Sequence, residues 1–136
     1  MALTILDAGV IIGVLDADDA HHQGARDALK AALERGDSLA MPASAYGEAL
    51  VSPARRGQEA MRAVDAFLAD LPAEVEPITR RVASRAAQLR AEHGTRLRLP
   101  DALVLATALH LRADRVLTTD SGWPNAGIAV DLVGRD

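Results

Sequence analysis

The stretch LRLPDALVLATALHLRADRVLTTD, residues 97–120, decides the expected fold. Pro100 is typical of the start of a helix, where its missing N–H would be unpaired in any case. Asp101 follows in the first turn, where the positive end of the helix dipole favours a carboxylate. Residues 102–111 contain only two polar side chains, so the helix is predicted to be buried on almost every side.

A second acid follows the strand that comes after this helix. Residues 115–119 read as a short buried strand, and Asp120 stands at its end. In an open α/β sheet, ligands bind where the C-terminal ends of strands meet the N-terminal ends of helices. Asp101 and Asp120 are therefore expected to face one crevice.

The rest of the chain alternates short apolar strands with helices. Strands are expected at residues 3–6, 39–41, 75–78 and 128–133, and helices at residues 8–15, 20–35, 43–51, 57–71 and 79–93. Pro53 is expected to stop the helix that starts at residue 43, and Pro77 indicates an edge strand. The alternation predicts an α/β fold with a parallel sheet, in a single domain of residues 1–136.

Composition excludes several classes of protein. The 136 residues include no cysteine, which excludes thiol catalysis, disulfides and cysteine-ligated zinc. The longest apolar run, residues 8–15, is far shorter than the roughly 20 residues that a membrane span needs. A cytoplasmic protein without a membrane partner is expected. The net charge of −4 does not predict nucleic-acid binding, although acids concentrated at a metal site would produce the same sign.

Four acids interrupt or end apolar segments: Asp7, Glu48, Asp101 and Asp120. A single such acid is ordinarily a helix cap or a solvated edge. Four converging carboxylates would repel one another by several kcal/mol per pair at ~4–5 Å and an effective dielectric constant of about 20. Bound cations relieve such repulsion, and oxygen ligands without histidine or cysteine favour Mg²⁺ or Mn²⁺.

These acids lie within motifs whose order and spacing resemble a known family. The chain resembles the PIN-domain ribonucleases, and more narrowly the VapC toxins of type II toxin–antitoxin systems. The matching segments are residues 6–12, residues 18–22, Glu48, residues 99–108 and residues 117–120.

The resemblance implies a three-layer α/β/α fold with a central, mostly parallel sheet, and a metal-dependent endoribonuclease. Asp7 and Asp101 match the direct ligands of one or two Mg²⁺ or Mn²⁺ ions. Glu48 and Asp120 would complete the site directly or through water, as a catalytic set of four acids. Thr118 matches a position at which a hydroxyl would orient a carboxylate.

The same resemblance implies partners. An RNA substrate, a cognate antitoxin protein and a homodimer formed through residues 42–71 are expected. Arg55 and Arg56 are the candidates for RNA contact. Arg81 and Arg85, four residues apart on one helix face, are typical of a solvated surface, with RNA contact as the alternative.

A departure from the family pattern leaves alternative functions open. The family commonly has serine or threonine two residues after the first acid, whereas this chain has Gly9. A catalytically inactive PIN-fold module that binds RNA or protein, and a PIN nuclease acting on DNA or in RNA processing, remain alternatives. A phosphoryl-accepting receiver domain also places acids at strand ends, but the only lysine, Lys30, is expected in the middle of a helix.

Overall fold

The computed structural model describes residues 1–136 and contains five strands and seven helices. In chain order the elements are β1 (Leu3–Leu6), α1 (Ala8–Leu15), α2 (His22–Glu34), β2 (Ser38–Pro42), α3 (Ala43–Ala49), α4 (Val51–Arg56), α5 (Gln58–Asp70), β3 (Ala73–Glu76), α6 (Arg80–His93), α7 (Leu99–His110), β4 (Arg115–Thr118) and β5 (Ala129–Leu132). None of the helices has the length and apolarity that crossing a bilayer would require.

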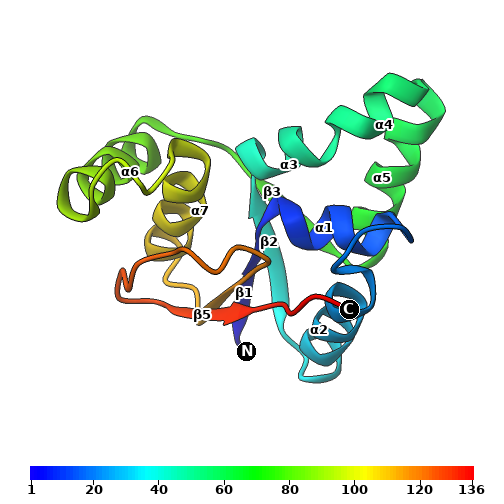
Figure 1. Ribbon diagram of the computed structural model, residues 1–136, viewed down its shortest axis with the longest axis horizontal. Helices are drawn as coiled ribbons and strands as arrows, with labels where there is room; N and C mark the ends of the chain where they lie inside the picture. The colour runs from blue at the N-terminus through cyan, green and yellow to red at the C-terminus, as the bar shows by residue number, and fades with distance from the viewer.

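The five strands form one parallel sheet in the order β3-β2-β1-β4-β5. Helices α6 and α7 lie on one side of this sheet, and α1, α2 and α5 lie on the other (Figure 1). The predicted three-layer α/β/α architecture is confirmed. The strand order differs from the 2-1-3-4-5 order of flavodoxin-like receiver domains, so the phosphoryl-accepting alternative does not fit this fold.

Helix α7 is buried because it has neighbours on two sides. Val104 and Ala108 belong to the main apolar cluster around the sheet. Leu105 and Ala106, on another face of the helix, pack with α6 in a second apolar cluster, in which Leu89 is also buried. The near absence of a polar face in the sequence of α7 therefore reflects its position between the sheet and α6.

The predicted helix of residues 43–51 is wrong at its C-terminal end. Helix α3 ends at Ala49, and α4 then runs from Val51 to Arg56 with Pro53 inside it. Pro53 is the third residue of α4, where a backbone N–H has no intrahelical acceptor, so the proline removes no hydrogen bond. Strand β3 begins at Ala73, before the predicted range, and lies at an edge of the sheet as expected.

Helix α7 ends in a turn that normally requires glycine. Arg112 has φ = 53° and is the only residue other than glycine with a positive φ. Its N–H donates to the Leu109 carbonyl (3.2 Å) and the Ala113 N–H donates to the Ala108 carbonyl (2.9 Å), which is the Schellman pattern of helix termination. A non-glycine residue in this conformation costs about 1–2 kcal/mol.

Candidate functional site

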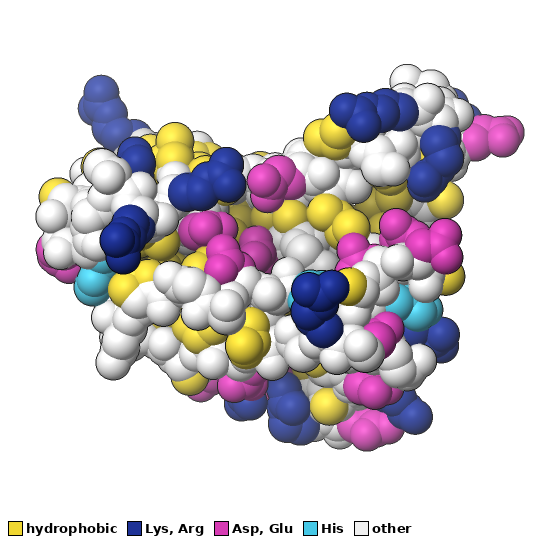
Figure 2. Space-filling model, viewed as in Figure 1, with side chains coloured by type: hydrophobic (Ala, Val, Ile, Leu, Met, Phe, Trp, Pro, Cys, Tyr) yellow, Lys and Arg dark blue, Asp and Glu magenta, His cyan; other side chains and the backbone are white.

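The four predicted acids come from four elements around the C-terminal ends of the central strands. Asp7 follows β1 and is the N-cap of α1, and Asp120 follows β4. Glu48 lies in the last turn of α3, and Asp101 lies in the first turn of α7. Figure 2 shows acidic side chains gathered in a hollow of the surface, with basic side chains on both of its rims.

Asp7 is the most enclosed of the four, with 9% of its surface exposed. Its Oδ1 accepts a hydrogen bond from the Ala8 N–H (2.8 Å), and its Oδ2 accepts one from Thr118 Oγ1 (2.7 Å). Burial raises the pKa of Asp7, the two hydrogen bonds oppose that rise, and the charge of Asp120 adds to it. The side chain is thus fixed in direction by α1 and β4.

Thr118 connects two of the acids. Its hydroxyl, which is fully buried, donates to Asp7 Oδ2 and also accepts a hydrogen bond from the Asp120 N–H (3.0 Å). Asp120 Oδ1 in turn accepts from the Gly122 N–H (2.8 Å). A single hydroxyl therefore positions the carboxylate of Asp7 and the backbone that carries Asp120.

The charges of the other three acids all act on the carboxyl group of Asp101. The pKa of Asp101 is raised to about 6, first by burial and then by the charges of Asp7 and Asp120, with a smaller contribution from Glu48. Arg98 acts in the opposite direction on the same carboxyl group. The charges of the other three acids thus reach Asp101, and their service as one functional site stays a prediction.

The four acids do not form a closed metal cluster in this structure. No three histidine, aspartate or glutamate side chains lie close enough together to hold a metal ion. Hydrogen bonds direct Asp7 Oδ2 toward Thr118 and Asp120 Oδ1 toward Gly122. The donor set nevertheless fits a hard divalent cation, because it offers only carboxylate oxygens, and burial together with their mutual repulsion raises the pKa of Asp101.

Two residues near the acids were not singled out from the sequence. Arg98, the N-cap of α7, is exposed and close enough to lower the pKa of Asp101. Thr119 explains the unusual Gly9, because a Cβ added at residue 9 would overlap the Thr119 hydroxyl. The only sequence signals were a basic residue two positions before Pro100 and a second threonine after Thr118.

The residues predicted to contact RNA, Arg55 and Arg56, are both exposed in the last turn of α4. Arg56 Nη1 donates a weak hydrogen bond to Ser52 Oγ (3.4 Å). Neither arginine is among the groups that shift the pKa of Asp7 or Asp101. Their role in RNA contact stays a prediction.

Replacing the bridging hydroxyl is expected to impair the site. Thr118→Val keeps the shape of the side chain but leaves Asp7 Oδ2 and the Asp120 N–H without this partner, so metal affinity or activity should fall about 10–100-fold. Thr118→Ser retains the hydroxyl and should stay within a few-fold of wild type. Metal titration and RNA cleavage measure the effect, with circular dichroism to verify folding. Equal loss in both variants would show that packing, and not the hydroxyl, matters.

Comparison with known proteins gives a family match and several similar folds. The sequence pattern of the PIN domain family matches residues 4–128. A toxin–antitoxin complex from Klebsiella pneumoniae superposes with a TM-score of 0.74 at 23% identity, over 100% of both chains. VapC20 from Mycobacterium tuberculosis, described as a sarcin-ricin loop cleaving toxin, superposes with a TM-score of 0.72 at 20% identity, over 98% of this chain and 99% of that one. Comparison with curated proteins gives no match.

Proposed function

The chain belongs to the PIN domain family, and we propose that it is a metal-dependent endoribonuclease that acts as the toxin of a type II toxin–antitoxin system. The observation that supports this most is the meeting of acids from four elements at the C-terminal ends of the central strands, where Thr118 joins Asp7 to Asp120. Burial and the charges of the other three acids raise the pKa of Asp101 to about 6. An isolated helix-capping acid would not be surrounded by three other carboxylates that act on its charge. Residues 1–136 are proposed to form one domain, because all five strands belong to a single sheet.

The proposed ligands of one or two Mg²⁺ or Mn²⁺ ions are the four acids, with Asp7 and Asp101 binding directly. Bound there, a divalent ion would activate water for attack on phosphorus and stabilise the developing negative charge. Thr118 positions Asp7 and the Asp120 backbone, and the carboxylates would turn from their present hydrogen bonds toward a bound ion. Arg98, exposed beside Asp101, is placed to attract a backbone phosphate of the substrate.

The proposed partners follow from the same family. One similar structure is a toxin–antitoxin complex, and another is VapBC2 from Rickettsia felis bound to a promoter DNA fragment. We propose a cognate antitoxin for this chain, and a homodimer through residues 42–71, where Val51 is 50% exposed. RNA is the proposed substrate, because VapC20 is described as cleaving the sarcin-ricin loop.

A catalytically inactive PIN-fold binding module and a PIN nuclease of RNA processing are the alternatives. An inactive module has no need for four acids gathered in one hollow of the surface, so their proximity favours a nuclease. The choice between a toxin and an RNA-processing enzyme depends on the substrate.

Metal removal tests the proposal. Protein free of antitoxin should cleave total RNA in Mg²⁺ or Mn²⁺ and lose this activity in EDTA, because hydroxide formation near neutral pH requires the metal. Restoring the metal after chelation should restore cleavage, which controls for denaturation. Cleavage that persists in EDTA would contradict a metal-dependent mechanism. A folded protein that binds RNA but cleaves none with either metal would favour the inactive module.

A further inference from the structure

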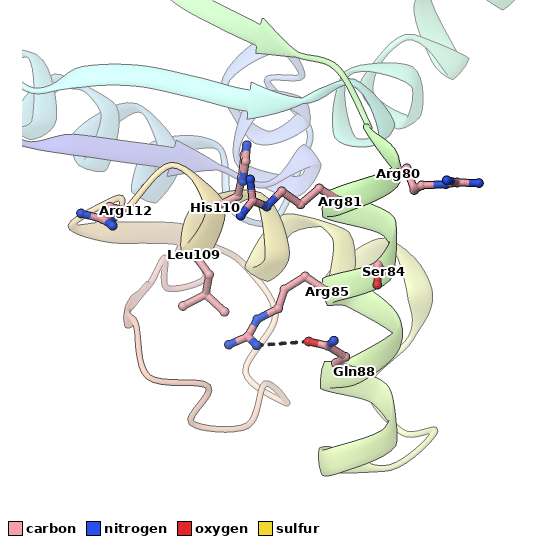
Figure 3. A pocket seen from close by; sticks show the side chains of 8 residues that line it. All are labelled: Arg80, Arg81, Ser84, Arg85, Gln88, Leu109, His110 and Arg112. Atoms are coloured by element: carbon pink, nitrogen blue, oxygen red, sulfur yellow. Dashed lines mark hydrogen bonds between the residues drawn. The ribbon is translucent and has the colours of Figure 1, made fainter.

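A pocket of ≈ 940 Å³ lies between α6 and the C-terminal end of α7, outside the acidic site. Four of its eight lining residues are arginines and one is histidine, whereas only Leu109 is hydrophobic. In Figure 3, Arg81 and Arg85 extend from α6 toward the end of α7, while Arg80 points away from it. A net charge of −4 for the whole chain makes this concentration of cations unexpected.

The cations of this pocket have no acidic partners. The ion pairs of the structure involve other basic residues, namely His21, Lys30, Arg35, His93 and Arg115. Arg85 Nη1 donates only to the neutral Gln88 side chain (3.2 Å), and no hydrogen bond is made by the side chain of Arg81 or Arg112. Exposed guanidinium groups without an acidic partner are suited to bind an anion from outside.

Arg112 supplies an independent observation. It occupies the left-handed position after α7, at which glycine would be the relaxed choice. Arg112 therefore keeps a strained conformation in the wall of the pocket, where Figure 3 shows it on the other side of the end of α7 from Arg81 and Arg85. Packing does not account for it, because Arg112 is exposed.

We propose that this arginine pocket binds successive backbone phosphates of a single RNA strand at a distance from the acidic site. Arg81, Arg85 and Arg112 are the proposed phosphate-binding residues. The inference rests on the proposed function for the choice of RNA as the polyanion. An acidic protein segment is the less suitable occupant, because protein interfaces rely on apolar and aromatic anchors and this pocket offers one leucine.

The pocket lies where an RNA strand bound in it could also reach the four acids of the site. Asp101 and His110 lie at opposite ends of α7, nine residues apart, which corresponds to about 14 Å along the helix axis. Single-strand binding folds contact about 4–16 nucleotides, which is more than enough to cover this length. The pocket would thus hold the strand while the scissile phosphate lies among the carboxylates.

Binding in EDTA tests this inference without cleavage. The probe is a fluorescein-labelled single-stranded RNA of about 16 nucleotides, followed by fluorescence anisotropy over a range of NaCl concentrations. Arg81→Ala combined with Arg85→Ala should weaken binding about tenfold. The slope of log affinity against log salt should become shallower by about 0.7 for each phosphate that is no longer neutralised, hence by about 1.4 for the pair.

Two further variants separate binding from folding. Arg112→Gly should reduce the slope by about 0.7 and yet keep or raise the melting temperature, since glycine relieves the strained turn. Arg26→Ala is the matched control, because Arg26 is an exposed arginine without an ion pair on α2, across the sheet from the pocket. It should change neither affinity nor slope.

Several outcomes would overturn the inference. Wild-type affinity and slope in the Arg81→Ala, Arg85→Ala double variant would exclude the pocket as an RNA site. A poly-glutamate peptide of matched charge that binds through the same arginines more tightly than RNA would assign the pocket to an acidic protein segment. Displacement of RNA by inorganic phosphate at the concentration of phosphate groups in the probe would indicate a free-anion site. Because no arm requires cleavage, a failed nuclease proposal leaves this result interpretable.

Discussion

Asp101→Asn is expected to lower the rate of RNA cleavage by about 10³-fold or more, while the metal-free protein becomes more stable. The loss follows because one of two proposed direct ligands is removed, and transition-state charge is then poorly stabilised. The gain in stability follows because burial, and then repulsion by Asp7, Asp120 and Glu48, disfavour the charge of Asp101 in the folded state. Since Asp101 is partly exposed, solvent screening reduces the expected gain to about 1–2 kcal/mol near neutral pH.

The sign of the pH dependence is opposite to that of an ordinary salt-bridged acid. The pKa of Asp101 is about 6 in the folded protein, compared with 3.8 for the unperturbed group. Its favourable contribution to stability is therefore fully present below pH 3.8 and is lost as the pH rises through about 6. In EDTA, the difference in stability between Asp101→Asn and wild type should shrink as the pH falls through this interval.

Cleavage kinetics and thermal unfolding in EDTA measure the two effects. Asp70→Asn is the matched control, since Asp70 is an exposed carboxylate at the end of α5 and no hydrogen bond involves its side chain. The control should retain wild-type cleavage and wild-type stability. An Asp101→Asn protein that cleaves at a rate close to wild type, or that is less stable than wild type in EDTA, would be inconsistent with the proposed site.

Leu105→Ala is expected to destabilise the protein by about 2–5 kcal/mol. Leu105 is fully buried and packs in the apolar cluster that joins α7 to α6. Its truncation would leave a cavity between the helix that carries Asp101 and the helix that carries most of the arginine pocket. For a chain of this length, the melting temperature should fall by about 10 °C or more.

Leu99→Ala provides the control for this prediction on the same helix. Leu99 is 49% exposed, so its truncation should change the free energy of unfolding by no more than about 0.5 kcal/mol. Chemical denaturation of both variants gives the comparison. If the two substitutions had equal effects, the second apolar cluster would not be the attachment of α6 to α7 that the structure indicates.

The sequence predicted the features that depend on local pattern. The apolar stretch of α7 indicated a helix with neighbours on several sides, and acids after β1 and β4 indicated a shared crevice because parallel strands end at one edge. The convergence of the four acids could therefore be anticipated, although not how Thr118 would bridge two of them. That bridge depends on the register between β1 and β4, which pairs Leu6 with Leu117.

Features that arise from tertiary contacts could not be predicted in this way. Arg81 and Arg85 read as a solvated helix face, because nothing in their own segment indicates that the end of α7 lies beside them. The left-handed conformation of Arg112 contradicts the usual preference for glycine at this position. The continuation of α4 through Pro53 was missed because Pro53 was read as the end of α3, whereas a new helix begins two residues before it.

The central claim is that the four acids form one site for a divalent ion, and direct Mn²⁺ titration followed by electron paramagnetic resonance tests it best. Wild-type protein near neutral pH should bind one or two ions per chain. Asp7→Asn and Asp101→Asn should each weaken binding by at least about tenfold, whereas Asp70→Asn should leave it unchanged. Absence of Mn²⁺ binding by folded wild-type protein, or equal binding by all four proteins, would contradict the account.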